Sequence, residues 1–358
     1  MPSKTGSHIS RAQQMRVLEG FAPVPDGLLL EHGGRIVEGR IAYRLAGIPG
    51  APVVCVLGGI SADRIVAVQE RDTGRGWWEW MVGTGRPLDT RVHQVLSIDY
   101  LFGPGESRGA VVNDTRAPAA SDAATVPLVT PLDQAHTLAA VTDALELDPL
   151  CGLIGASYGG AVALAFAATY PEKLLRACVI GAADSSHPLA TAWRVVQRRI
   201  VQRAVAVGDE AGGIALARVL AMTTYRSDIE LQQRFSGPPS ITEEGLRFPV
   251  EDYLDHHGQS FARRFTADQF LCLSQSSDLH VIEAEHITIP VTLVSTDPDF
   301  LAPRWQMEDL ARRMGDGHQL VRVSSLHGHD AFLTDEARFS EIVKDFVVAC
   351  GAAAGQGS

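Results

Sequence analysis

The sequence predicts an α/β protein with a mostly parallel sheet and an inserted helical cap. Three observations predict this fold class. Short apolar runs alternate with helical patterns along most of the chain. These runs are almost continuously apolar, as expected of strands buried on both faces of a parallel sheet. The alternation stops between about residues 183 and 286, where only helical patterns follow one another. Strands that alternate with helices are typical of a sheet covered by its crossover helices.

Six strands and three helices are predicted for the sheet domain. Thr130 and Pro131 predict the start of the first helix, as an N-cap and a first helical residue, and it runs to about Glu146. The second helix is alanine-rich and ends before Pro171, and the third lies near the C-terminus. The strands are expected at 53–57, 92–100, 151–154, 177–180, 289–295 and 319–323, and the last two helices at 158–170 and 339–349.

The middle of the chain predicts a separate helical piece. Helical patterns cover 191–207, 214–224 and 251–270, and no buried strand is evident among them. A chain of 358 residues suits one large core with an insertion. We therefore expect an α/β core formed by residues 1–185 and 287–358, and a helical cap formed by residues 186–286.

Composition narrows the class of protein. The net charge is -11 without a long basic run, which argues against a nucleic-acid partner. The five cysteines are widely spaced and form no CxxC pair, so we expect reduced, buried thiols and neither disulfides nor a zinc site. The N-terminal residues lack the apolar stretch of a signal peptide, and no run of about 18 apolar residues occurs. These features predict a cytoplasmic protein.

A candidate nucleophile lies in the segment Gly155-Ala156-Ser157-Tyr158-Gly159-Gly160. The pattern G-x-S-x-G is weak alone, but here a strand-like run precedes it and a helix follows, which is the setting of the nucleophile elbow in the α/β-hydrolase fold. Small residues let the chain turn back sharply, and the turn exposes the serine hydroxyl. Ser157 is therefore the predicted nucleophile; the alternative is an ordinary glycine-rich turn with a capping serine.

The acid and base of a catalytic triad are expected after the nucleophile, in the chain order Ser, Asp or Glu, His. Asp297 and Asp299 both follow the predicted strand 289–295, and carboxylates at this edge of a parallel sheet face the ligand crevice. We favour Asp299, because Asp297 precedes a proline and suits a turn. His327 and His329 follow the last strand, and we favour His329 as the base.

Three further segments carry a resemblance to a known family. They are Gly76-Trp77-Trp78-Glu79 continuing through Val82-Gly83-Thr84-Gly85 to Leu88-Asp89-Thr90; Arg218 with Thr224-Tyr225-Arg226-Ser227; and Gly328-His329-Asp330-Ala331-Phe332-Leu333. With these segments the sequence resembles the homoserine O-acyltransferases of methionine biosynthesis, which have the α/β-hydrolase fold. The resemblance implies Ser157 as the nucleophile, Asp299 as the orienting acid and His329 as the base.

The resemblance also implies substrate residues. Arg218 would hold the substrate carboxylate, Asp330 its ammonium group, and Tyr225 would join them; the backbone N–H of Ile60 would form an oxyanion hole with that of Tyr158. Each has a structural alternative: Arg218 as an arginine extended along its helix to solvent, and Asp330 as a helix cap. The Trp77-Trp78 pair is expected to anchor a loop or the core.

The implied reaction is a ping-pong transfer from acyl-CoA, a co-substrate, to L-homoserine, with no metal or bound cofactor and with a homodimer formed through the cap. Acetyl and succinyl donors both remain open, as does serine as the acceptor. A succinyl group would need an extra cation, for which Arg64, Arg108 and Arg226 are candidates. The loop Asp99–Ser107 departs from the family pattern near the expected mouth of the site. The rivals are a carboxylester hydrolase of the same fold and a non-catalytic binding protein.

Overall fold

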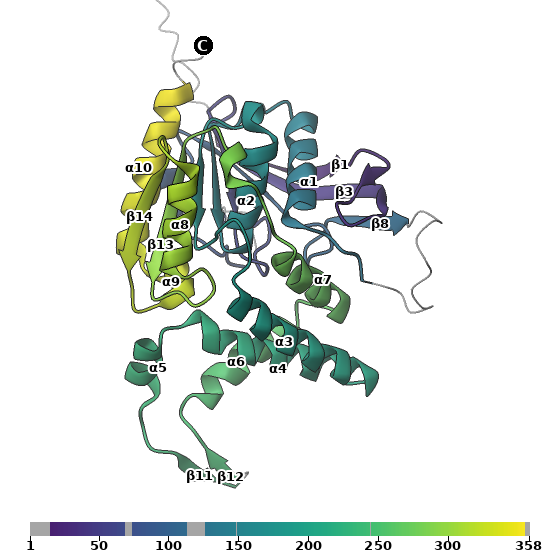
Figure 1. Ribbon diagram of the computed structural model, residues 1–358, viewed down its shortest axis with the longest axis vertical. Helices are drawn as coiled ribbons and strands as arrows, with labels where there is room; N and C mark the ends of the chain where they lie inside the picture. Colours follow the sequence, from purple (N-terminus) through teal and green to yellow (C-terminus); the bar gives the residue numbers. More distant parts are fainter. Residues whose placement is uncertain (1–14, 69–73, 113–125, 148, 244, 355–358) are drawn as a thin grey trace, which may run out of the picture.

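The computed structural model describes residues 15–68, 74–112, 126–147, 149–243 and 245–354, and these form a twisted sheet with helices on both faces (Figure 1). The strands lie in the order β1-β3-β7-β4-β9-β10-β13-β14. From β7 onward neighbouring strands are parallel. These parallel strands are β7 (Gln94–Ile98), β4 (Val53–Leu57), β9 (Gly152–Ala156), β10 (Ala177–Ile180), β13 (Val291–Asp297) and β14 (Gln319–Ser324).

The six predicted strands are confirmed, and no strand end differs from the prediction by more than two residues. The antiparallel edge was not predicted. It consists of β1 (Arg16–Pro23), β2 (Leu28–Leu29), β3 (Arg35–Gly47) and β8 (Arg108–Val112). Most residues of β1 are exposed, and charged residues interrupt β3. These strands therefore lack the continuous apolar runs that mark strands buried on both faces.

Two apolar clusters hold the helices against the sheet. One packs α1 (Pro131–Ala144), α2 (Tyr158–Thr169) and α8 (Arg304–Met314) on one face. The other packs α10 (Glu336–Ala354) on the opposite face. The predicted cap of α1 is confirmed, since the Thr130 hydroxyl accepts the N–H of Asp133 at 3.2 Å. Helix α10 is longer at both ends than predicted.

The chain between β10 and β13 forms a group of helices at the carboxyl end of the parallel strands (Figure 1). The prediction of one helix over 251–270 is wrong: the helix ends at Ala262, and a new one begins after Thr266, whose side chain and that of Gln269 form a capping box. A short exposed hairpin was not predicted either. The helices are α3 (Pro188–Ala206), α4 (Glu210–Tyr225), α5 (Asp228–Phe235), α6 (Glu251–Ala262) and α7 (Ala267–Asp278), and the hairpin is β11 (Ser240–Thr242) with β12 (Gly245–Arg247). The division of the chain at residues 186 and 286 stays a prediction.

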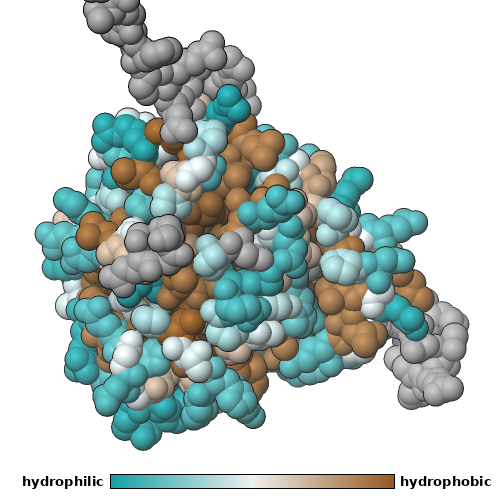
Figure 2. All heavy atoms as spheres, turned by 90° about the horizontal axis from the view of Figure 1, so that it is seen from above, coloured by the Kyte–Doolittle hydropathy of each residue, from teal (hydrophilic) through white to brown (hydrophobic). Residues whose placement is uncertain are grey.

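Short elements complete the chain. Strands β5 (Val82–Gly83) and β6 (Leu88–Asp89) pair after the tryptophan segment, and helix α9 (Ala331–Thr334) precedes α10. All five cysteines are free and buried. Among the described residues, no helix is both long and apolar enough to cross a membrane. At the end of the molecule opposite α3 to α6, polar and apolar side chains are interspersed on the surface (Figure 2).

Candidate active site

The candidate nucleophile lies in a tight turn between β9 and α2. Ser157 has φ 54° and ψ −119°, a conformation that costs a non-glycine residue free energy. A Cβ atom on Gly155 would collide with the carbonyl oxygen of Gly159, and one on Gly159 would collide with the carbonyl oxygen of Leu57. The glycines at these positions are therefore required by the close approach of three backbone segments. The turn is the strand–turn–helix setting that the sequence pattern predicts.

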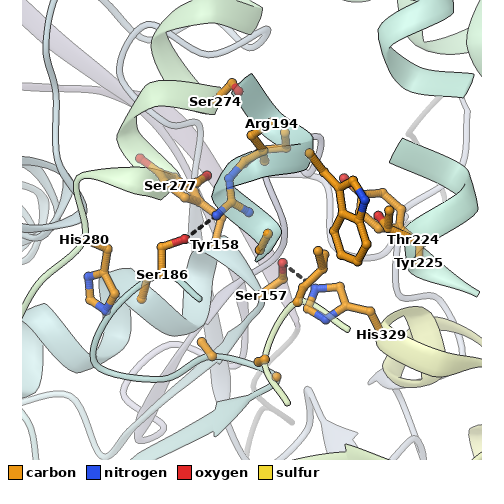
Figure 3. A pocket seen from close by; sticks show the side chains of 18 of the residues that line it. Ser157, Tyr158, Ser186, Arg194, Thr224, Tyr225, Ser274, Ser277, His280 and His329 are labelled. Carbon is orange, nitrogen blue, oxygen red and sulfur yellow. Dashed lines mark hydrogen bonds between the residues drawn. The ribbon is translucent and has the colours of Figure 1, made fainter. Parts of the chain in front are cut away.

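Ser157, His329 and Asp299 form a continuous hydrogen-bonded chain. His329 Nε2 lies 2.8 Å from Ser157 Oγ (Figure 3), and His329 Nδ1 lies 2.7 Å from Asp299 Oδ2. The other carboxylate oxygen of Asp299 accepts the backbone N–H groups of Leu301 and Ala302 at 2.8 and 3.0 Å. Asp299 and His329 are both buried. The structure thus brings the three side chains together in the order that a triad needs.

The two alternative residues lie elsewhere. Asp297 is more than half exposed and lies 3.6 Å from Arg304, whereas the imidazole of His329 is hydrogen-bonded to Asp299. His327 Nδ1 lies 3.2 Å from the carboxylate of Glu230, and its ring does not reach Ser157. Asp297 is the last residue of β13, whereas Asp299 lies two residues beyond the strand, in a turn whose N–H groups of Leu301 and Ala302 hold its other carboxylate oxygen.

The charge on His329 is set by competing effects. Complete burial lowers the pKa of His329, but the carboxylate of Asp299 raises it through its charge and its hydrogen bond, with a further contribution from Asp330. The result is a pKa above the ordinary value of 6.5. A histidine of this kind takes up a proton from Ser157 more readily than a free imidazole would.

Two backbone N–H groups point to an oxyanion site beside Ser157. Tyr158 is the first residue of α2, so its N–H has no acceptor within the helix. Ile60 follows β4 in a loop that passes Ser157, since a Cβ atom on Gly59 would lie 4.0 Å from Ser157 Oγ. Within the described residues neither N–H group has a hydrogen-bond acceptor. They fit the predicted pair of donors for a developing negative charge.

Arg218, Tyr225 and Asp330 line one cavity together with Ser157 and His329. The guanidinium of Arg218 lies 4.9 Å from the ring centroids of both Tyr225 and Phe261, so the side chain is held over aromatic faces and is not extended to solvent. Asp330 precedes α9, but its side chain makes no capping hydrogen bond. Instead its carboxylate lies 3.4 Å from Arg226, which keeps a buried charge paired. The alternatives of an exposed arginine and a helix cap do not describe these contacts.

The tryptophan segment supports this cavity. Trp78 is fully buried, and its indole N–H donates to the carbonyl of Phe332 at 2.7 Å. Trp77 stacks on it with ring centroids 5.4 Å apart, and Trp77 also lines the cavity. The pair therefore ties the loop after β4 to the segment that carries His329, as the anchoring role predicts.

The loop Asp99–Ser107 lies behind the site. The hydroxyl of Tyr100 donates to the carbonyl of Gly58 at 2.6 Å, and its ring packs edge-on against Tyr158. Tyr100 therefore contacts both segments that carry the candidate oxyanion donors, the loop after β4 and the start of α2. Neither cavity at Ser157 is lined by this loop, which differs from the expected position at the mouth. Its carboxylate at Asp99 holds Arg64 at 2.5 Å.

None of the three arginines considered for an acyl carboxylate is placed for that task. Arg64 pairs with Asp99, and Arg108 donates to backbone carbonyls of its own loop. Arg226 pairs with Asp330 and Glu230. The structure instead places Arg194 in a second cavity at Ser157, and no local sequence pattern marks this arginine. No three His, Cys, Asp or Glu side chains converge as a metal site would need, among the residues that the structure describes.

Comparisons with known proteins agree with this geometry. Residues 52–336 match the family model described as the alpha/beta hydrolase fold. The homoserine O-succinyltransferase of Xanthomonas campestris is 36% identical over 316 residues, which cover 88% of this chain and 80% of that protein. The chain belongs to the homoserine O-acyltransferase family of α/β hydrolases.

Other family members differ in donor and acceptor. The serine O-succinyltransferase of Litchfieldella anticariensis is 32% identical, over 91% of this chain and 97% of that protein. The crystal structure of homoserine O-acetyltransferase from Bacillus anthracis superimposes with a TM-score of 0.78 at 17% identity, over 94% of this chain and 98% of that one. At that identity the structural likeness supports the fold alone.

The close backbone packing at Gly159, in the turn between β9 and α2, predicts how a substitution there changes the stability of this homoserine O-acyltransferase family member. Gly159→Ala should lower the free energy of unfolding by about 1–3 kcal/mol, because the added methyl group forces backbone apart in a packed interior. Urea unfolding followed by circular dichroism measures the change. Gly237→Ala is the control: its Cβ would meet only Pro249 at an ordinary 3.6 Å, so a shift within about 0.5 kcal/mol is expected. Equal effects of both variants would contradict the steric account.

The pairing of Asp299 with His329 generates a pH prediction. His329 acts as a base only when neutral, so the reactivity of Ser157 should fall as the pH drops through a value above 6.5. This acidic limb of the pH profile is measured as the rate at which a fluorophosphonate probe modifies Ser157 at different pH values.

Asp299→Asn should slow the modification by up to about 10⁴-fold and move the limb to lower pH, because burial then acts on the imidazole without the opposing carboxylate. Asp297→Asn is the matched control and should leave rate and pH limb nearly unchanged. A profile that moves with Asp297 and not with Asp299 would refute the assignment of the acid.

Proposed function

We propose that this protein transfers an acyl group from acyl-CoA to the side-chain hydroxyl of L-homoserine, a step of methionine biosynthesis. The observation that carries the proposal is the cavity in which Arg218 and Asp330 lie beside the Ser157–His329 pair. A guanidinium and a carboxylate in one cavity suit the carboxylate and ammonium groups of an amino acid. The 36% identical relative is a homoserine O-succinyltransferase, which supports the same acceptor.

The first half-reaction forms an acyl-serine. His329 Nε2 takes the proton of Ser157 Oγ, and the oxygen attacks the thioester carbonyl carbon. The negative charge on the carbonyl oxygen is bound by the N–H groups of Ile60 and Tyr158. The C–S bond then breaks, and the imidazolium returns its proton to the departing CoA thiolate. The acyl group is left as an ester on Ser157.

The second half-reaction reverses these roles. His329 takes the proton of the homoserine hydroxyl, whose oxygen attacks the ester carbonyl carbon. The bond to Ser157 Oγ breaks, and the proton passes from His329 to that oxygen. Arg218 holds the homoserine carboxylate and Asp330 its ammonium group, which fixes the hydroxyl near the ester. The chemistry needs no metal or bound cofactor; acyl-CoA is a co-substrate.

Acyl transfer to homoserine must be faster than hydrolysis of the acyl-serine, and the cap helices favour transfer because they enclose the acceptor cavity. Arg218 and Tyr225 belong to α4, so the acceptor cavity is closed by the cap on one side and by the oxyanion loop on the other. An alcohol held by two charged groups has a far higher effective concentration at the ester than free water. A carboxylester hydrolase would need neither Arg218 nor Asp330. A non-catalytic binding protein would not need the aligned triad.

Free thiol release in a mixture of protein, acyl-CoA and L-homoserine tests the proposal. We expect release that depends on homoserine and an O-acylhomoserine product seen by mass spectrometry. Ser157→Ala should abolish both. L-Serine in place of homoserine tests the shorter acceptor, for which one methylene changes the free energy by about 1–3 kcal/mol.

Arg218→Gln separates a transferase from a hydrolase in the same assay. It should lower kcat/KM for homoserine by about 30-fold or more, because the substrate carboxylate loses its charged partner. Arg203→Gln is the matched control, since Arg203 is exposed near the end of α3. Thiol release that does not depend on homoserine, together with hydrolysis of simple esters, would refute the transferase function and identify the protein as a hydrolase.

We also propose that the protein acts as a cytoplasmic homodimer formed through the cap. Five free, buried cysteines suit a reducing compartment. The hairpin of the cap exposes apolar side chains: Ile241 is 89% and Leu246 59% exposed, and Phe248 follows at 48%. Apolar side chains gathered on a projecting hairpin are typical of a contact surface.

Sedimentation velocity tests the dimer. The wild-type chain should sediment as a dimer, and Ile241→Asp should shift it toward the monomer, because a charge would be buried in the contact. Leu29→Asp is the control, since Leu29 is 70% exposed on the antiparallel edge of the sheet. A wild-type monomer at micromolar concentration would rule out the dimer.

A further inference from the structure

Ser157 faces two cavities of different character. The cavity with Arg218 and Asp330 is described above as the acceptor side. The second cavity shares Ile60, Ser157, Tyr225 and His329 with it, and it extends under α3 and α7 (Figure 3). An acyl group on Ser157 Oγ would project toward one cavity while the acceptor occupies the other. The second cavity is therefore the place for the acyl chain.

The second cavity is polar along its far wall. Figure 3 shows Arg194 reaching from α3 into the cavity toward Ser186, with which it is hydrogen-bonded. Four serines line the same cavity beside its apolar side chains: Ser185, Ser186, Ser274 and Ser277. An acetyl group ends in a methyl and can make no hydrogen bond to Arg194 or to these serines, whereas an acyl group that ends in a carboxylate can.

Only one edge of the Arg194 guanidinium is occupied by hydrogen bonds. Its Nε and Nη2 lie 2.8 and 2.7 Å from the same oxygen of Asp278, and Nη2 also reaches Ser186. Its Nη1 has no acceptor among the residues that the structure describes. A planar guanidinium held on one edge presents its remaining N–H groups in a fixed direction, which suits a carboxylate.

The charge of this cluster is not neutralised. Asp278 also accepts from Arg198 at 2.6 Å, so two guanidinium groups share one carboxylate. These two arginines keep the pKa of Asp278 below its ordinary value although burial opposes them. His280 is the other basic side chain of this wall, and burial lowers its pKa to about 4, so it adds no charge near neutral pH. The described residues that line the cavity include no Asp or Glu. One net positive charge remains, centred on Arg194.

We propose that the second cavity receives an acyl group that ends in a carboxylate, of the succinyl type, and that Arg194 binds this carboxylate through Nη1. The proposal rests on the acyl transfer proposed above and names its donor: a thioester of a four-carbon dicarboxylic acid with CoA. The bonds made and broken at Ser157 are those of the two half-reactions already given. Arg194 touches neither reacting atom; it selects the acyl group.

The charge of Arg194 also reaches the reacting centre. It lowers the pKa of His329, against the effect of Asp299, which places the guanidinium within electrostatic reach of the imidazole. A bound carboxylate would cancel this effect.

The ratio of kcat/KM for succinyl-CoA to kcat/KM for acetyl-CoA, at saturating L-homoserine, tests the proposal. The wild-type ratio should exceed one. Arg194→Gln should lower the ratio about 30-fold or more, since Arg194 is the one Arg or Lys among the described residues that line the cavity, and the distal carboxylate loses that charged partner. Arg194→Lys keeps the charge without the planar fork, and it should give an intermediate ratio.

Arg199→Gln is the control. Arg199 lies on the same helix α3 as Arg194, but it is exposed, does not line the cavity and is not one of the arginines that bind Asp278. It should leave the donor ratio unaltered. Circular dichroism confirms that each variant is folded.

The outcomes separate the two proposals. Transfer from acetyl-CoA that equals or exceeds transfer from succinyl-CoA would overturn the role of Arg194 and leave the acyltransferase intact. An equal loss with both donors in Arg194→Gln would show a structural role only, and would also overturn it. An absence of homoserine-dependent transfer with every donor would overturn the proposed function itself.

Discussion

The tight turn between β9 and α2 is the constraint on which the site depends. Ser157 can hold its strained backbone only because the strand before it and the helix after it are both buried, and because no Cβ atom intervenes at Gly155 or Gly159. The same close approach brings the loop after β4 alongside the hydroxyl. One steric condition thus places the nucleophile, the helix N-terminus and the second N–H donor within reach of one carbonyl group.

The buried charged groups around this turn are paired with one another. Asp299 is fixed by two backbone N–H groups and by His329, so the imidazole is oriented toward Ser157. Asp330 lies 3.4 Å from Arg226, so this buried carboxylate has a charged partner at the wall of the cavity that also holds Arg218. Buried charges of this kind contribute little net stability, and their value lies in specifying where a charged substrate group can sit.

The sheet and the cap contribute different groups to the site. The sheet supplies the triad and the oxyanion donors from the carboxyl ends of β4, β9, β13 and β14. The cap supplies Arg194 from α3, and Arg218 and Tyr225 from α4, and the packing of α3 against α7 closes the ion pairs around Asp278. In the proposed function, the sheet would carry out the acyl transfer and the cap helices would bind the charged groups of the substrates.

The sequence by itself determined the parallel core, the turn at Ser157 and the order of acid and base, because these depend on local patterns: apolar runs, small residues around one serine, and polar residues after strands. It favoured Asp299 over Asp297 without deciding between them, and it missed Arg194, the break in the helix after Ala262 and the antiparallel edge. Those are decided by tertiary structure. Whether an arginine faces solvent or a cavity depends on what packs against its helix, and for Arg194 that partner is α7, which lies some eighty residues further along the chain.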